Sequence, residues 1–419
     1  MAEASIRHMV GATYADMTLY PQAQAQLERA VELRTRLQGR NDPSTLQAKY
    51  ALGEVYRREG RLTDAENIST ETLATQRRVL GSENRDTLLT AQTVAEIYQE
   101  EGKYAQAEAL NRELVTHWRR VQGENSTGAL AIEDNLATVY IWQGKYAEAE
   151  RVQRQIIGVM LRARGVPKRH PFAATGNLLA MTVGFEGKFA EAETLYRQSV
   201  EGLEQFAGKQ DRDTLIMTEG IAWACLQSGK YAEGDALFSQ VLNTQRRVLG
   251  NDHPITLVTL SDWGAAYRYR GMYDKAEALL TEAADGRRRK LGIGHPGTLN
   301  SVGDLGWVYL IEGRYSEAEH LLEEATAGLA KARTGVWQEQ NVVCALGAAL
   351  VAQIQYARAE PLLVGGFQKM LDLRATIPAE EAFDLQAAAR STVKLYRDWN
   401  KPQQAEEWQR KSRQAGVSI

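Results

Sequence analysis

The segment at residues 102–108, Gly-Lys-Tyr-Ala-Gln-Ala-Glu, constrains the fold most, because it recurs almost letter for letter along the chain. The spacing between copies is 42 residues, with one step of 43, and periods of roughly 20–50 residues are typical of solenoids and propellers. The 419 residues are therefore expected to form a stack of repeats and not two or three globular domains. Close copies begin at Gly144, Gly187, Gly229 and Gly313, and looser ones at Gly60 and Gly271.

Each repeat is predicted to be a pair of helices, one on either side of the recurring glycine. Before the glycine, apolar residues fall at helical spacing, as in Leu136, Ala137, Tyr140 and Ile141. One position of this first helix is always small, which lets a neighbouring helix approach closely. The small residues are Gly53, Ala95, Ala137, Ala180, Ala222, Gly264, Gly306 and Gly347, and a mostly larger residue follows three positions later in each copy.

The recurring glycine is expected to end the first helix, because glycine readily adopts the left-handed conformation found at helix ends. Within the motif, Lys103 and Glu108 are expected to face solvent. Residues 1–419 are predicted to form a single continuous array, and the nearly all-polar helix at 401–419 is predicted to cap its C-terminal end. The predicted turns lie near residues 18, 60, 102, 144, 187, 229, 271, 313, 354 and 400.

The repeat pattern resembles the tetratricopeptide repeat (TPR). It has a small residue, an aromatic three positions later, Gly-Lys-Tyr at the turn and Ala-Glu on the second helix. The longer period here, with Arg-Arg-Val-Leu-Gly ending the second helix and linkers such as Asn-Asp-His-Pro-Ile-Thr-Leu, resembles the kinesin light chain subtype. The resemblance implies an all-α, right-handed α-solenoid of about ten stacked antiparallel helix pairs. It also implies a partner groove on the concave face, lined by the first helices.

One ligand that this family binds, the C-terminal carboxylate of chaperones, is disfavoured by the sequence. The resemblance places a carboxylate-binding asparagine nine residues before the turn glycine. Only Asn135 matches that pattern, and Asp262 and Asp304 at the same position of later repeats would repel a carboxylate.

Aromatic residues at other groove positions favour a protein partner, because they supply large contact area at low entropic cost. They stand six or two residues before the turn glycine in the middle repeats. The alternative, that some of them only pack between adjacent first helices, stays open. The candidate groove residues are Arg58, Asn135, Trp142, Phe185, Trp223, Arg268, Tyr269 and Trp307.

No catalytic, cofactor-binding or metal site is predicted. The string Gly292–Gly297 fits G-x-G-x-x-G, but no strand precedes it. His170, His253 and His295 each precede a proline in equivalent loops, where capping or solvation is the simpler role. Cys225 stands at the larger position of a first helix and is expected to be a buried thiol.

Charge and cysteine content limit the partners and the compartment. The net charge of −3 gives no field that would attract nucleic acid or an anionic membrane. The longest apolar run, residues 342–354, is too short to span a bilayer. Cys225 and Cys344 suggest no disulfide framework, which favours the reducing cytoplasm. The basic run Arg287–Lys290 is predicted to be a solvated helix end, and the alternative is a ridge that binds an acidic partner.

These observations predict a non-catalytic scaffold that binds a partner peptide or helix in the concave groove. The alternative is a regulatory or sensor TPR region of a larger protein with a fused kinase, ATPase or protease, because the first repeat begins almost at Met1. Self-association through the N-terminal end is also expected. An enzyme in its own right is favoured by nothing in these residues.

Overall fold

The computed structural model describes residues 1–162, 170–332, 336–378 and 381–418. Their regular structure is entirely helical, and no strand occurs among them. The predicted all-α solenoid of helix pairs is therefore confirmed. The chain divides into two compact units, Met1–Trp142 and Gln143–Ile419. Each is described here by itself.

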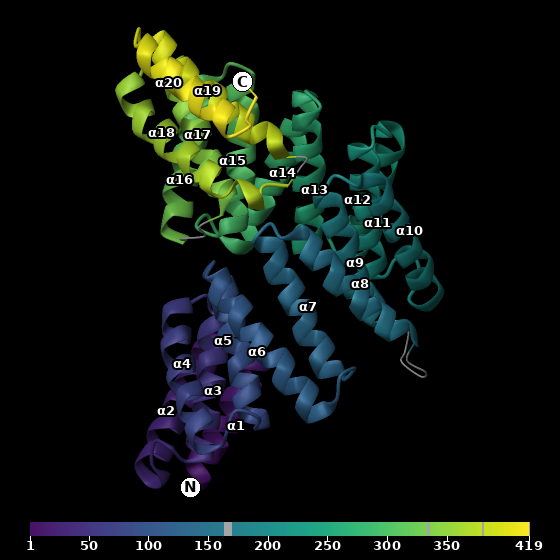
Figure 1. The fold of residues 1–419 in the computed structure, drawn as a ribbon, viewed down its shortest axis with the longest axis vertical. Helices are drawn as coiled ribbons and strands as arrows, with labels where there is room; N and C mark the ends of the chain where they lie inside the picture. The colour runs from purple at the N-terminus through teal and green to yellow at the C-terminus, as the bar shows by residue number, and fades with distance from the viewer. Residues whose placement is uncertain (163–169, 333–335, 379–380, 419) are drawn as a thin grey trace. The chain divides into compact units, whose positions relative to one another are not determined.

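The first unit contains seven of the described helices (Figure 1). In this unit, each helix packs against the helix before it and the helix after it in the sequence. The helices are α1 (Ala2–Asp16), α2 (Tyr20–Gln38), α3 (Pro43–Arg58), α4 (Leu62–Val79), α5 (Arg85–Glu100), α6 (Tyr104–Gln122) and α7 (Thr127–Trp142).

In the second unit, helices that follow one another in the sequence pack together in the same way. In addition, α19 packs against both α17 and α18 (Figure 1). Its helices are α8 (Tyr146–Arg162), α9 (His170–Phe185), α10 (Phe189–Phe206), α11 (Arg212–Gln227), α12 (Tyr231–Val248), α13 (Pro254–Tyr269), α14 (Tyr273–Leu291), α15 (Pro296–Ile311), α16 (Tyr315–Ala332), α17 (Trp337–Ala352), α18 (Tyr356–Asp372), the 3₁₀ helix η1 (Arg374–Thr376), α19 (Ala382–Asp398) and α20 (Pro402–Gln414).

The turn between the two helices of a repeat is made by one residue with positive φ. Glycine occupies it in seven repeats, with φ of 76° at Gly60 and 73° at Gly102, for example. Three repeats adopt the same conformation without glycine, at Thr18, Ile354 and Asn400. The backbone follows the repeat geometry at all three: Asn400 tolerates this conformation well, whereas it is disfavoured for the β-branched Thr18 and Ile354.

The loops that start the next repeat use side-chain caps. His253 Nδ1 accepts a hydrogen bond from the backbone N–H of Ile255 at 3.3 Å, and His295 Nδ1 accepts one from Gly297 N–H at 3.1 Å. The predicted capping role of these two histidines is confirmed. The side chain of His170 lies outside the described residues.

The small position of the first helix is where the two helices of a repeat touch. At Gly306 an added Cβ would lie 2.7 Å from Leu322 Cγ, and at Gly264 it would lie 2.8 Å from Leu280 Cγ. Leu280 and Leu322 are both fully buried. A leucine of the second helix thus fills the space that the missing side chain leaves.

The lysine and glutamate of the recurring motif are partly exposed, and they also connect neighbouring repeats. Lys103 Nζ lies 2.6 Å from Glu66 Oε1, in the preceding repeat. Lys230 pairs with Glu193 at 2.8 Å in the same way. Such partly exposed pairs are each worth about 0–1 kcal/mol, so they fix the register of the stack more than its stability.

Arginines near the end of the second helix form a similar series. Arg246 pairs with Glu282 at 2.6 Å and Arg288 pairs with Glu324 at 3.0 Å, each partner lying one repeat further along. Arg287 instead points inward, where its Nη1 donates to Ser301 Oγ at 2.6 Å. The basic run 287–290 is therefore largely engaged within the array and offers few free cations to an acidic partner.

Replacing Gly306 by alanine is expected to destabilise the array relative to replacing Gly202 by alanine. Gly202, in α10, has no atom within 4 Å of an added Cβ, whereas the new methyl group at position 306 meets Leu322. Both changes gain up to about 1 kcal/mol of helix propensity, but overpacking costs about 1–3 kcal/mol at position 306 alone. Urea denaturation followed by circular dichroism measures the difference. Equal midpoints for the two variants would contradict the proposed contact.

Candidate binding face

A hollow of about 500 Å³ opens on the face of the second unit that the first helices form. Most of its wall is apolar, including Met181, Ile216 and Val258. Three of the predicted groove residues, Phe185 of α9, Trp223 of α11 and Tyr269 of α13, line it together. We call this cavity, bordered by α9, α11 and α13, the inner hollow.

The aromatic side chains of the inner hollow are held by one another. Phe185 and Trp223 pack edge to face, with ring centroids 6.4 Å apart. Phe189 of α10 also packs edge to face on Trp223, with ring centroids 5.8 Å apart. The indole of Trp223 lies over Gly184, where a Cβ would be only 2.3 Å from the ring. Because the ring rests on bare backbone, it has little freedom to move toward α9, and it presents a fixed surface to the cavity.

Two acidic side chains, Glu219 of α11 and Asp262 of α13, also line the inner hollow. Enclosure by the protein raises the pKa of Asp262 to about 6, although the side chain still reaches the water of the cavity. The same enclosure, together with the charge of Asp262, raises the pKa of Glu219. Because both carboxyl groups line the same cavity, the negative charge of Asp262 disfavours ionisation of Glu219.

A second polar site on this face is centred on the buried carboxylate of Asp384, in the first turn of α19. Arg268 of α13 donates two hydrogen bonds to it, at 3.2 and 3.4 Å, and Tyr269 Oη donates one at 2.9 Å. Asn341 Nδ2 of α17 donates another at 3.0 Å. We call Arg268, Tyr269, Asn341 and Asp384 the Asp384 cluster. Because it joins residues 116 positions apart, the first-helix face of the second unit must curve inward to bring α13 and α19 together.

The position of Arg268 and Trp307 differs from the sequence prediction. Arg268 is only 4% exposed and is used by Asp384, so it is not presented to a partner. Trp307 is 5% exposed and lies beside Arg268, whose guanidinium carbon is 5.6 Å from its ring. For Trp307 the structure therefore favours the alternative interpretation, packing between first helices.

The other candidate residues, Arg58, Asn135 and Trp142, belong to the first unit. Trp142 is 43% exposed and stacks on Tyr104 with ring centroids 6.5 Å apart. Asn135 is half-buried on α7. Arg58 is exposed, with its Nε 3.8 Å from a carboxylate oxygen of Glu54. In this unit, none of the described cavities contains these three residues.

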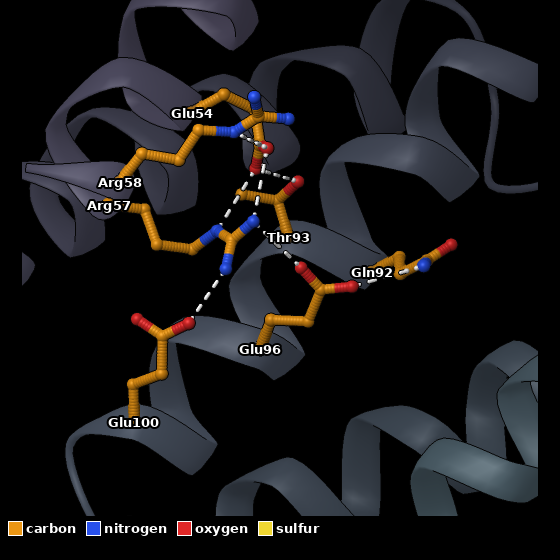
Figure 2. Close-up of polar contacts among 7 residues, drawn as sticks. All are labelled: Glu54, Arg57, Arg58, Gln92, Thr93, Glu96 and Glu100. Atoms are coloured by element: carbon orange, nitrogen blue, oxygen red, sulfur yellow. Dashed lines mark hydrogen bonds and ion pairs between the residues drawn. The ribbon is translucent and has the colours of Figure 1, made fainter. Parts of the chain in front are cut away.

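A network of ion pairs around Arg57, on α3 and α5 of the first unit, is not predicted from the sequence. Arg57 contacts the carboxylates of Glu54 at 3.2 Å, Glu96 at 3.2 Å and Glu100 at 2.7 Å (Figure 2). Burial raises the pKa of Glu96, against the opposing effect of Arg57. Glu54 and Glu96 stand six residues before their turn glycines, so the repeat register could have revealed this acidic pair.

A group of potential metal ligands occurs at Glu193, Cys225 and Glu233, whose ligand atoms lie within 4.8 Å of one another. Arg197 and Lys230 already pair with these carboxylates, at 2.6 to 2.9 Å. Burial and the two glutamates raise the pKa of the Cys225 thiol, which keeps it protonated. The arrangement therefore agrees with the predicted buried thiol and does not favour a cation.

The geometry described above defines a helical repeat protein with a ligand-sized hollow on its first-helix face. The family model of the tetratricopeptide repeat matches residues 2–78, 86–161, 224–289 and 258–331, which is more than half of the chain. The chain therefore belongs to the tetratricopeptide repeat family, as its sequence predicts. None of the curated proteins compared with it matches. In the described part of the chain, no helix is long and apolar enough to cross a membrane.

Two solved structures share the fold with a TM-score above 0.5, and a third resembles it over a shorter stretch. A Rap protein in complex with competence and sporulation factor aligns over 99% of this chain and 98% of its own, with 11% identity and a TM-score of 0.55. The apo quorum sensor NprR of B. thuringiensis aligns over 77% and 87%, with 14% identity and a TM-score of 0.56. Kinesin light chain TPR-like repeats of Podosopora anserina align over 49% and 97%, with 22% identity and a TM-score of 0.45. At these identities the likeness concerns the fold.

Replacing Asp262 by asparagine is expected to stabilise the protein at neutral pH but not at pH 4. The folded-state pKa of Asp262, about 6, lies above the ordinary value of 3.8, so stability is lost as the pH rises through this interval. Glu219, Arg287 and Asp304 are the charged groups that act on it. Because the side chain reaches water, we expect a gain on the order of 1 kcal/mol. Thermal melts of both proteins from pH 4 to 7.5 measure it, and a gain independent of pH would contradict the assignment.

Replacing Asp384 by alanine is expected to destabilise the packing of α19 by about 3–5 kcal/mol, because the buried guanidinium of Arg268 loses its counter-charge. The control is Asp398→Ala in the same helix, which removes a more exposed pair with Lys394 worth at most about 1 kcal/mol. Amide hydrogen exchange of α19 and α20 measures the loss of protection in each of the two variants. Equal protection in the two variants would show that the Asp384 cluster does not hold α19.

Proposed function

We propose that this chain is a non-catalytic protein–protein interaction scaffold whose first-helix face binds a peptide or helical segment of a partner. The observation that carries the proposal is the inner hollow, where Phe185, Trp223 and Tyr269 border one cavity of about 500 Å³. A rigid aromatic wall offers contact area without a large loss of side-chain freedom, as in the centres of many interfaces. The residues are positioned by helices and not by loops, which favours a preformed site.

Features outside the inner hollow agree with a scaffold. The recurring motif residues are used to hold neighbouring repeats together, as at Lys103 and Lys230. The variable positions of the first helices are the ones that remain to determine selectivity. Cys225 and Cys344 are both free and buried, which suits a scaffold in the reducing cytoplasm. The Rap protein among the structural neighbours was solved in complex with competence and sporulation factor, which is consistent with a binding role for this fold.

The test is an unbiased random-peptide display library panned on the full chain, with enriched peptides measured by fluorescence anisotropy. Replacing Trp223 by alanine is expected to weaken their binding at least about tenfold, because the central aromatic contact is lost. Tyr315→Ala is the control, since Tyr315 is an exposed aromatic residue of the second helix α16 that lies outside the inner hollow.

Two outcomes would contradict the proposal. One is that no peptide is enriched on the wild-type chain above a display background. The other is that enriched peptides bind Trp223→Ala and wild type equally while circular dichroism shows both to be folded.

A further inference from the structure

The polar part of the inner hollow carries charge of one sign. Glu219, Asp262 and Glu381 are the ionisable carboxylates among its lining residues, and no lysine, arginine or histidine is among them. Among the described residues, no cation lies within ion-pair distance of Glu219 or Asp262. Thr259 Oγ1 donates a hydrogen bond of 2.7 Å to Glu219 Oε2. The cavity is therefore an apolar pocket whose wall carries the carboxyl groups of Glu219 and Asp262, and Arg287 acts on Asp262 only from beyond ion-pair distance.

The cations nearest to this cavity are already occupied. Arg268 gives its guanidinium to Asp384 and lies 3.9 Å from Asp304. Arg287 donates to Gly297 O at 2.8 Å and to Ser301 Oγ at 2.6 Å. An acidic partner would thus find no available counter-charge on this part of the face, whereas a basic one would find two carboxyl groups without a cation.

The two carboxyl groups are arranged for a ligand that carries several donors. They come from adjacent first helices, α11 and α13, and both line the inner hollow. A guanidinium that enters the cavity can donate charge-assisted hydrogen bonds to both carboxylates. The apolar walls accept the methylene stem of such a side chain, and the rings of Trp223 and Tyr269 can receive an adjacent apolar residue.

We propose that the inner hollow recognises a basic side chain, arginine in preference to lysine, within an extended and otherwise apolar partner segment. The guanidinium lies between Glu219 and Asp262, and the neighbouring apolar side chain packs on the aromatic wall. This inference rests on the proposed function, because it specifies the chemistry of the segment that the scaffold binds. The inner hollow differs from the acidic site of the first unit, where Glu54, Glu96 and Glu100 already form ion pairs with Arg57 (Figure 2).

The test uses the peptides enriched by the unbiased library on the full wild-type chain. The expected result is enrichment of arginine next to an apolar residue. Resynthesis of the strongest peptide with citrulline in place of arginine keeps the shape and removes the charge, and binding is expected to fall at least about tenfold.

The double variant Glu219→Gln and Asp262→Asn tests the site on the protein. It is expected to lose at least about tenfold in affinity for the arginine peptide and to bind the arginine and citrulline peptides alike, because the two changes remove one interaction. The control is Glu317→Gln, an exposed carboxylate on α16 paired with Arg314. Circular dichroism of each variant shows that the fold is retained.

The outcomes separate this inference from the proposed function. If peptides are enriched and depend on Trp223 but carry no basic residue, the scaffold function stands and the basic-ligand inference is wrong. Equal loss on citrulline substitution in wild type and in the double variant would place the arginine contact elsewhere. If no peptide is enriched at all, the proposed function itself fails.

Discussion

The close contact between the two helices of each repeat is the constraint on which the rest of the structure depends. At Gly264 and Gly306 no side chain separates the first helix from a buried leucine of the second helix. Helices packed this closely are restricted in crossing angle and register, since larger residues at the contact would push them apart. Once one pair is fixed in this way, the next pair can only stack on it in the same orientation, and a solenoid results.

This packing also decides which residues are free to carry function. The leucines and small residues fill the space between helices, and the lysine and glutamate of the motif connect one repeat to the next, as in Lys103 and Glu66. The arginines at the ends of the second helices are used in the same manner, for example Arg246 with Glu282. What remains is the exposed side of the first helices, where sequences differ between repeats. The inner hollow and the Asp384 cluster are both built there.

The sequence predicts the helix pairs and their turns well because both follow from local rules. Gly60 and Gly102 have the positive φ that a helix end requires. Thr18 lies one 42-residue period before Gly60, whereas the turns at Ile354 and Asn400 follow at other spacings and are indicated by the Ala-Glu pairs after them. Phe185, Trp223 and Tyr269 could be placed on one face for the same reason. The role of Arg268 could not be predicted, because its partner Asp384 is 116 residues away and is reached only through the curvature of the second unit. The solvent-facing prediction for Lys103 did not include its ion pair with Glu66, because that partner belongs to the neighbouring repeat.

The two polar sites on the first-helix face of the second unit show two ways in which one fold accommodates enclosed carboxylates. In the Asp384 cluster a fully buried carboxylate is stable because four hydrogen bonds and a guanidinium replace its water. In the inner hollow, enclosure by the protein raises the pKa values of Glu219 and Asp262, and among the described residues no cation lies within ion-pair distance of either carboxylate. A basic ligand favours the charged form of both groups, whereas a neutral ligand gains no such interaction. Under the proposal above, selectivity for a basic segment follows from this difference, and it requires no movement of the helices that hold the pocket.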